Sequence, residues 1–459
     1  MSQNYQADAW ERRRNQRSAR AKAAARKKKR NRRILLGSAA ALVLVLVLLL
    51  VRCSEDKAGA GESAGASDVT ESTGIEETHR ATITVTGDLL IHKPIITACT
   101  QGSEYDFTEI FQYIAPYTSR SDLAIANLET TLAGTENGYA YSGYPNFNCP
   151  DAIVDGAKEA GFDILLTANN HSYDTDSAGF LRTQQVIRDK GLQNLGTTMT
   201  DEEKPYIIRD VNGIRLGLIC YTYGEIDEAT GQPAVNAFSL SPELANNINV
   251  FAYDKLDRFY GEIEQRIGAM KSDGAEAIVV FIHWGAEYQT HTTSSQPVIA
   301  QKMCDLGVDV IIGGHPHVVQ PVEVLTSTVD SGRKTLCVYS LGNAVSNQRS
   351  DNMDLNTGHT EDGMLFTFAF VRDPNGQVVL DSAELLPTWV CIRSSETVFD
   401  YNILPLDKTV TDWKSAFDIG DNNLASAENS WQRTMDLTGE GMEAVDAWLG
   451  SKKTSASED

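Results

Sequence analysis

The sequence predicts an α/β fold, in which short buried strands alternate with covering helices. Runs rich in Val, Ile and Leu recur through residues 82–340, as expected of strands that are buried on both faces. Stretches of helical length and pattern separate them, at residues 177–190, 255–270 and 296–306. Polar residues follow the strand-like runs directly, and this is where open α/β sheets place their ligands.

The run at residues 308–312 shows the pattern most clearly. It leads into two glycines and then into His315, Pro316 and His317. The glycines let the backbone turn sharply, and the proline fixes φ between the two imidazoles. Two metal-type ligands are therefore presented rigidly at a strand end. Taken alone, such a His-x-His is more often a loop with two surface histidines, so the interpretation depends on similar motifs elsewhere.

Four earlier runs end in the same manner. In chain order they are followed by Asp88, by Asn127 and Glu129, by Asn169, Asn170, His171 and Asp174, and by His283, Trp284 and Glu287. A later run, at residues 336–340, is followed by Asn343. Each motif alone also fits an ordinary turn or a solvated loop acid. If the strands are parallel neighbours, however, their carboxyl ends share one edge and these side chains converge there.

The converging set predicts a metal site. It contains carboxylate oxygens, an amide oxygen and imidazole nitrogens from Asp88, Glu129, Asn170, His171, His283, His315 and His317. These donors suit Mn, Fe or Zn, and seven are too many for one tetrahedral ion but suitable for two ions that share a carboxylate. Such a pair can clamp the attacking and leaving oxygens of a phosphoryl displacement. A structural zinc site is typically closed and rich in cysteine, whereas none of the seven cysteines lies in these motifs.

The N-terminal region predicts a membrane anchor. Residues 1–33 carry 13 of the 40 Lys and Arg but only 2 of the 62 Asp and Glu, and residues 34–51 are 18 residues without a charge. A helix of this length spans the hydrocarbon core. The positive-inside rule then predicts a single-pass protein of the cell membrane, with a cytoplasmic N-terminus and an extracellular main domain. A cleaved signal peptide is the alternative, but Arg52 disfavours a small-residue cleavage site.

The rest of the chain divides into three parts. Residues 52–79, rich in Gly, Ala, Ser, Glu and Thr, predict a flexible linker. Residues 80–347 form the predicted main domain. Residues 348–459 are expected to be a C-terminal extension, with a hairpin that continues the fold, then short helices and a polar tail. The chain beyond the basic head is strongly acidic, which argues against a nucleic-acid partner because phosphate backbones need cationic surfaces.

In their order, these motifs resemble the CapA-type proteins of poly-γ-glutamate capsule biosynthesis, which are relatives of the calcineurin-like metallophosphoesterases. The resemblance covers residues 81–347. It implies a four-layer α-β-β-α metallophosphoesterase-like sandwich, with one or two divalent ions (Mn, Fe or Zn) bound at the strand ends. By motif match, the implied metal ligands are Asp88, Glu129, Asn170, His283, His315 and His317.

The resemblance also implies catalytic and supporting roles. His171 falls where the phosphoesterases keep a histidine that protonates the leaving group, and Asp88 is counted with it as catalytic. The supporting positions expected around the ligands are His92, Asn127, Asn169, Asp174, Trp284, Glu287 and Asn343. Two positions depart from the phosphoesterases: Leu90 replaces a histidine, and Glu129 replaces an aspartate. Both departures match the pattern of the capsule family.

The expected function is therefore that of a membrane-anchored, extracytoplasmic protein in poly-γ-glutamate synthesis, export or anchoring. It is expected to act as a metal-dependent hydrolase on an anionic polymer or a phosphoester. One alternative is an envelope phosphodiesterase or phosphatase. Another is a non-catalytic accessory subunit of a membrane polymer synthase, whose other subunits would be its partners.

Overall fold

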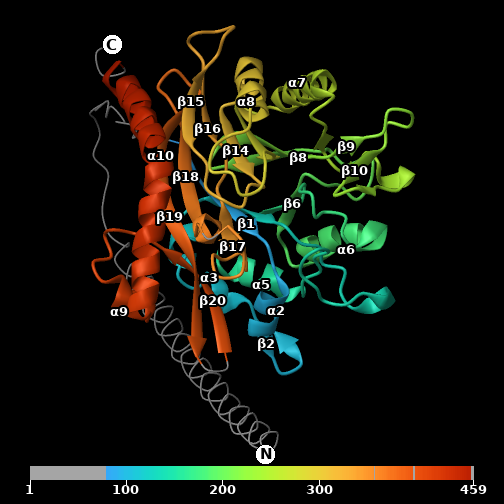
Figure 1. The fold of residues 1–459 in the computed structure, drawn as a ribbon. Coiled ribbons are helices and arrows are strands. Elements are labelled where there is room, and N and C mark those ends of the chain that lie inside the picture. The colour runs from blue at the N-terminus through green and yellow to red at the C-terminus, as the bar shows by residue number, and fades with distance from the viewer. Residues whose placement is uncertain (1–78, 356, 396–397, 456–459) are drawn as a thin grey trace, which may run out of the picture. The chain divides into compact units, whose positions relative to one another are not determined.

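The computed structural model of the chain describes residues 79–355, 357–395 and 398–455 (Figure 1). The predicted basic segment, the predicted transmembrane helix and nearly all of the predicted linker lie outside these residues. Within the described ranges, no helix combines the length and the apolar character needed to cross a membrane. The described residues all belong to one compact unit.

The first of two large sheets has the strand order β20-β19-β18-β1-β4-β5-β6, and β17 also pairs with β1. Its parallel strands are β1 (Arg80–Leu89), β4 (Leu123–Leu128), β5 (Ile164–Leu166), β6 (Gln193–Leu195) and β17 (Asn343–Val345). Its antiparallel strands are β18 (Asp362–Arg372), β19 (Val378–Ser395) and β20 (Val398–Pro405). The parallel strands place several carboxyl ends at one edge.

The second large sheet has the order β12-β8-β13-β14-β16-β15, and β7 also pairs with β8. Its parallel strands are β8 (Ile214–Tyr223), β12 (Val250–Phe251), β13 (Ala277–His283), β14 (Val310–Gly314) and β16 (Lys334–Val338). Its antiparallel strands are β7 (Ile207–Val211) and β15 (Val322–Thr326). Asn212 and Gly213 join β7 to β8 with φ of +52° and +81°, as a type I′ turn requires.

The two sheets pack face to face, and helices cover their outer faces. One buried cluster lies between the sheets and joins Val85 and Ile125 of the first to Leu218 and Phe281 of the second. A second cluster lies under α2 (Lys93–Ala98), α3 (Thr108–Phe111) and α5 (Ala152–Glu159). A third lies under α7 (Leu256–Ser272) and α8 (Ser295–Leu306). Burial on both faces is why the strands read as continuous apolar runs, and the mixed α/β class is confirmed.

The remaining elements are short, apart from α6 and α10. They are α4 (Ala115–Thr118), α6 (Asp176–Asp189), α9 (Trp413–Phe417), α10 (Asp421–Ser455), β2 (Thr100–Gln101), β3 (Glu104–Tyr105), β9 (Glu225–Ile226), β10 (Pro233–Val235), β11 (Phe238–Ser239), and the 3-10 turns Glu136–Gly138, Pro242–Leu244 and His359–Glu361. Strands β9, β10 and β11 form a small sheet of their own, directly after β8.

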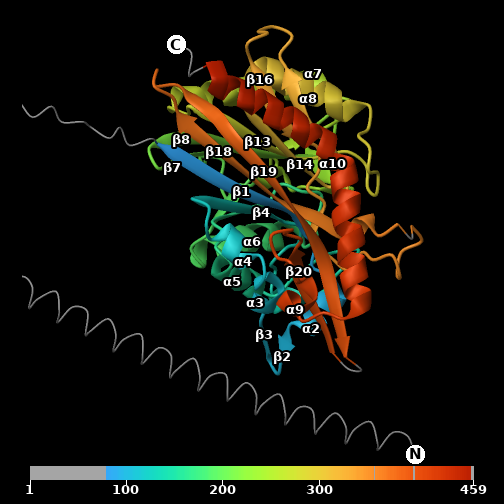
Figure 2. The ribbon, with the colours of Figure 1, turned by 90° about the vertical axis from the view of Figure 1, so that its left-hand side faces the viewer.

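The C-terminal extension differs from its prediction. In place of several short helices, α9 is followed by one helix of 35 residues, α10, which runs along β18 and β19 (Figure 2). Its buried residues include Ser430, Thr434 and Thr438. These small polar residues leave little apolar periodicity, so the sequence pattern did not indicate a long helix. The extension is also integral to the fold, because β18, β19 and β20 complete the first sheet.

Candidate metal centre

The predicted ligands lie at strand ends of both sheets. Asp88 is near the end of β1, Glu129 follows β4, and Asn170 and His171 follow β5; His283 ends β13, and His315 and His317 follow β14. The prediction that all these ligands share one sheet edge is therefore wrong in detail. Apolar runs look alike in either sheet, so they do not reveal which strands pair. The convergence itself is present. All seven side chains belong to buried residues, none more than 6% exposed.

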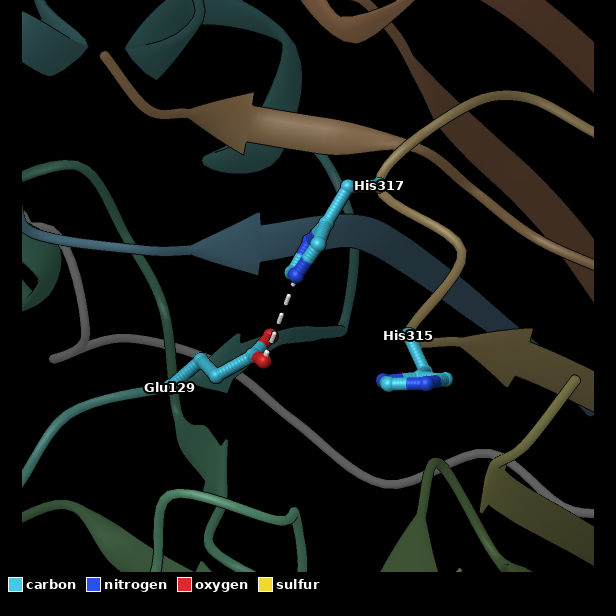
Figure 3. A group of neighbouring side chains, drawn as sticks. All are labelled: Glu129, His315 and His317. Carbon is cyan, nitrogen blue, oxygen red and sulfur yellow. Dashed lines mark ion pairs between the residues drawn. The ribbon is translucent and has the colours of Figure 1, made fainter. Parts of the chain in front are cut away.

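One group of contacts forms around His317. Its Nδ1 lies 3.1 Å from Oδ2 of Asp88, and its Nε2 lies 3.7 Å from Oε1 of Glu129. Figure 3 shows the Glu129 carboxylate turned toward the His317 ring, with the His315 ring beside them. Two carboxylates and an imidazole from both sheets thus face one another.

A second group forms around His283. Its Nε2 lies 2.8 Å from Oδ1 of Asn170 and 3.5 Å from Oε1 of Glu129. The ring of His315 is next to it, with the two ring centroids 4.8 Å apart. The same oxygen of Glu129 therefore faces both groups, as a carboxylate shared between two ions would.

Two buried atoms provide a test of whether a cation fits. Oε1 of Glu129 and Nδ1 of His315 have no hydrogen-bond partner among the described residues. Buried polar atoms are rarely left unpaired, and a bound cation would satisfy both. Donor atoms of Glu129, His315 and His317 lie within 4.8 Å of one another, as do those of Asp88, Glu129 and His283. Carboxylate and imidazole donors in this arrangement fit a divalent Mn, Fe or Zn ion.

Backbone strain accompanies the ligands. His315 and His317 have φ of +98° and +55°, and nearby Tyr288 has φ of +64°. Residues other than glycine cost about 1–3 kcal/mol in such conformations and persist only where the surroundings enforce them. One contact that holds this backbone is the hydrogen bond from the Tyr288 N–H to the carbonyl of Pro316, at 2.7 Å. The chain therefore holds both histidines in place at an energetic cost.

Amide side chains orient the carboxylates and His317. Nδ2 of Asn127 donates to Oδ1 of Asp88 at 2.7 Å and to Oε2 of Glu129 at 3.2 Å. Nδ2 of Asn169 in turn donates to Oδ1 of Asn127 at 3.1 Å. Oδ1 of Asn343 lies 3.1 Å from Nδ1 of His317. The structure thus places three of the expected supporting residues in direct contact with the ligands or with each other.

His171 is held by Asp174. Its Nδ1 lies 2.8 Å from Oδ2 of Asp174, which also accepts the Phe147 N–H at 2.6 Å. This pairing leaves Nε2 as the ring nitrogen available to a substrate. The Phe147 ring packs edge-on against His171, and His92 packs edge-on against Phe147, with centroids 4.7 and 5.1 Å apart. His92 is therefore one ring removed from His171.

The last two expected supporting residues lie elsewhere. Trp284 is fully buried in the core and donates from Nε1 to the carbonyl of Tyr339 at 2.9 Å. Glu287 is exposed. Burial raises the pKa of Tyr223, whose ring centroid lies 4.6 Å from that of His315, and the charge of Glu287 raises this pKa further. Among the described residues, neither side chain belongs to the groups of donor atoms that lie within 4.8 Å of one another.

The sequence pattern did not indicate every residue of the site, and Asn236 and Tyr288 are two examples. Asn236 accepts a hydrogen bond from Nδ2 of Asn170 at 3.1 Å, although it lies 66 residues further along the chain. Tyr288 accepts from Nε2 of Gln348 at 3.1 Å, and its ring centroid lies 6.2 Å from that of His317. Asn236 follows no predicted strand end, and Tyr288, which comes directly after Glu287, carries a phenol instead of the carboxylate, amide or imidazole that the pattern selected.

The electrostatics of the site centre on Glu129. Burial alone would lower the pKa of His317, but the carboxylates of Glu129 and Asp88 raise that pKa to about 9. Burial would raise the pKa of Glu129, but His283 and His317 hold it below its usual range. Burial, with His283 nearby, lowers the pKa of His315 well below its ordinary value. Without a metal, the site therefore holds an ionised Glu129, a protonated His317 and a neutral His315 at neutral pH.

Comparison with known proteins shows the family. Residues 82–348 match the family model of the bacterial capsule synthesis protein PGA_cap. The chain is 27% identical over 316 residues to the capsule biosynthesis protein CapA of Bacillus anthracis, covering 67% of this chain and 68% of that one. It is 27% identical over 241 residues to the PGA biosynthesis protein CapA of Bacillus subtilis (strain 168), covering 52% of this chain and 57% of that relative.

Similar solved structures include phosphoesterases at low similarity. The calcineurin-like phosphoesterase YfkN of Bacillus subtilis has 15% identity and a TM-score of 0.36, with 78% of this chain and 98% of that chain covered. A putative 5'-nucleotidase of Staphylococcus aureus has 14% identity and a TM-score of 0.40, with 77% and 58% covered.

The family model spans more than half of the chain, so this chain belongs to the PGA_cap family of bacterial capsule synthesis proteins. The predicted resemblance to CapA-type proteins is confirmed.

Replacing Glu129 tests the shared carboxylate. Because one Glu129 oxygen faces both groups, we predict that Glu129→Gln loses most of the bound metal from both positions. The measurement is the manganese content of the purified full-length protein after dialysis against Mn²⁺ and then metal-free buffer. Glu203→Gln is the matched control, since Glu203 pairs with Arg188 away from the site. An unchanged manganese content in Glu129→Gln would contradict the shared position.

The raised pKa of His317 predicts a pH-dependent affinity. The pKa of His317 is about 9, so at a lower pH a metal ion must displace a proton from this ring. The affinity for the metal should therefore rise about tenfold per pH unit from pH 7 and level off near pH 9. Glu129 is already ionised and His315 already neutral, so neither adds to this slope. Calorimetry in two buffers with different ionisation enthalpies should show about one proton released. A flat affinity over this range would disprove the assignment.

Proposed function

We propose that this protein is a membrane-anchored, extracytoplasmic member of its family that acts in the synthesis, export or anchoring of poly-γ-glutamate as a metal-dependent hydrolase. The observation that carries the proposal is the buried Glu129 carboxylate, which belongs to two sets of close donor atoms, one with His315 and His317 and the other with Asp88 and His283. The names of the two Bacillus relatives, which refer to capsule and PGA biosynthesis, support the polymer as the biological context.

The ligand set suits hydrolysis. One or two divalent ions at these residues would lower the pKa of a water molecule and offset charge on the scissile group. The chain itself orients the ligands: Asn127 positions both carboxylates, and Asn343 contacts His317. Burial of the whole set strengthens these electrostatic interactions. The proposed substrate is an anionic polymer or a phosphoester that enters at the carboxyl ends of the strands.

His171 is the proposed acid of the reaction. Asp174 accepts from Nδ1 of His171 and fixes the orientation of the ring, so that Nε2 faces the leaving group as the proton donor. The Phe147 N–H holds Asp174 in turn, and the Phe147 ring limits the movement of the imidazole. A positioned general acid of this kind acts on phosphoesters as well as on other esters and amides. An envelope phosphodiesterase or phosphatase is therefore the second candidate function.

Turnover of an aryl phosphate tests the hydrolase. With Mn²⁺ added, the unsubstituted protein should hydrolyse p-nitrophenyl phosphate or its diester, and His171→Ala should lower kcat by roughly 10²–10⁴-fold. The bound manganese should stay unchanged, because His171 contacts Asp174 instead of the ligand groups. His359→Ala serves as the control, since His359 lies beside Asp362.

The same assay also distinguishes the hydrolase from the non-catalytic alternative. A protein that binds manganese, turns over neither ester and co-purifies with membrane proteins would be an accessory subunit of a polymer synthase. Equal rates for His171→Ala and the unsubstituted protein would remove His171 from the mechanism.

The proposed anchor has its own test. We predict that the full-length protein sediments with membranes and resists extraction by salt, whereas a variant without residues 34–51 stays in the supernatant. Protease added to intact spheroplasts should degrade the main domain, because the positive-inside rule places it outside. Recovery of the full-length protein in the supernatant, or protection of its main domain in intact cells, would refute the proposed topology.

A further inference from the structure

A strained hairpin reaches the candidate metal centre. In the small sheet after β8, β10 and β11 pair Val235 with Phe238, so Asn236 and Ala237 form a two-residue turn. Their φ values are +46° and +62°, which is the type I′ conformation. Glycine is favoured at the second position of this turn, yet Ala237 occupies it. The chain thus holds the tip in a costly conformation, which is a feature that clusters at functional sites.

The tip presents Asn236 to the site. Asn236 is exposed, whereas Asn170 and His171 beneath it are buried. Its Oδ1 accepts from Nδ2 of Asn170 at 3.1 Å, and its Nδ2 lies 3.4 Å from Nδ1 of His171. Nδ1 of His171 is already paired with Asp174, at the shorter distance of 2.8 Å. The hydrogen bond to Asn170 is therefore the main interaction that the side chain makes here.

That hydrogen bond decides which end of the Asn170 amide faces the metal ligands. An asparagine side chain has one oxygen, which can bind a cation, and one NH₂ group, which cannot. Nδ2 of Asn170 points to Asn236, so Oδ1 lies 2.8 Å from Nε2 of His283, in the group that contains Glu129. If the acceptor on Asn236 is removed, the Asn170 amide can rotate and present N–H groups to the ligand cluster.

We propose that Asn236 is a positioning residue for the metal ion held by Asn170 and His283. It keeps the oxygen of Asn170 directed at the ion from outside the ligand cluster. Partners of this kind behind a metal ligand typically change metal affinity by about 10–100-fold when they are replaced. The inference rests on the metal site of the proposed function, but it does not require that the protein hydrolyses anything.

Mn²⁺ titration of the full-length protein by calorimetry tests it. Asn236→Gly removes the acceptor at a position whose positive φ suits glycine, so the turn is retained. This variant should bind Mn²⁺ about 10–100-fold more weakly. Asn236→Asp keeps an acceptor oxygen and should restore the affinity of the unsubstituted protein. Ala237→Gly relaxes the turn but keeps the Asn236 side chain, so its affinity should match the unsubstituted protein.

A double substitution separates positioning from a general loss of structure. In an Asn170→Ala background, Asn236→Gly should cause no further loss, because its effect passes through Asn170. A full loss in that background, an unchanged affinity in Asn236→Gly alone, failure of Asn236→Asp to restore binding, or absence of Mn²⁺ binding by the unsubstituted protein would each overturn the proposal. A protein that passes these titrations but turns over no ester leaves the inference intact and refutes only the hydrolase.

Discussion

The contact of the Glu129 carboxylate with imidazoles from the other sheet is the interaction on which the site depends. A fully buried carboxylate is costly unless hydrogen bonds and positive charge surround it. Asn127 supplies one hydrogen bond, to Oε2, while Oε1 is left facing His283 and His317. The two sheets must therefore pack in one register, because a shift would leave this charge buried without a partner. The need to keep the Glu129 charge opposite these imidazoles therefore fixes both the packing of the sheets and the geometry of the ligands.

A close backbone contact between Gly87 and Gly342 joins the first sheet to the segment that follows the second sheet. A Cβ on Gly87 would overlap the carbonyl oxygen of Gly342, and the absence of that Cβ lets the Asp88 N–H donate to this carbonyl at 3.1 Å. The neighbouring Asn343 then begins β17, pairs with β1 at Asp88, and contacts His317. The segment after β16 of the second sheet thus becomes a strand of the first. This crossing explains why polar side chains from both sheets meet in a small volume without a long connecting loop.

Much of the site could be predicted because each ligand lies at the end of a buried strand or a few residues beyond it. Asp88, Glu129 and His283 are marked by the apolar runs before them, and parallel pairing brings such ends together. The division into two sheets could not be predicted from the runs, because strands buried on both faces have the same pattern in either sheet. Asn236 could not be predicted either: it lies at a hairpin tip, and its contact with the site depends on how β10 and β11 fold back after β8.

The contacts around His317 and the contacts around His283 differ in their donors. Leu90, at the position two after Asp88, is 1% exposed and packs in the core, and His92 is separated from His171 by the Phe147 ring. The group at Asp88 therefore lacks an imidazole from its own strand, whereas the group at His283 gains the Asn170 oxygen and the adjacent His315 ring. An ion bound beside His283 would therefore have the fuller set of donors. The orientation of the Asn170 amide would then affect this position directly, which gives a physical reason for the strained turn at Asn236 and Ala237.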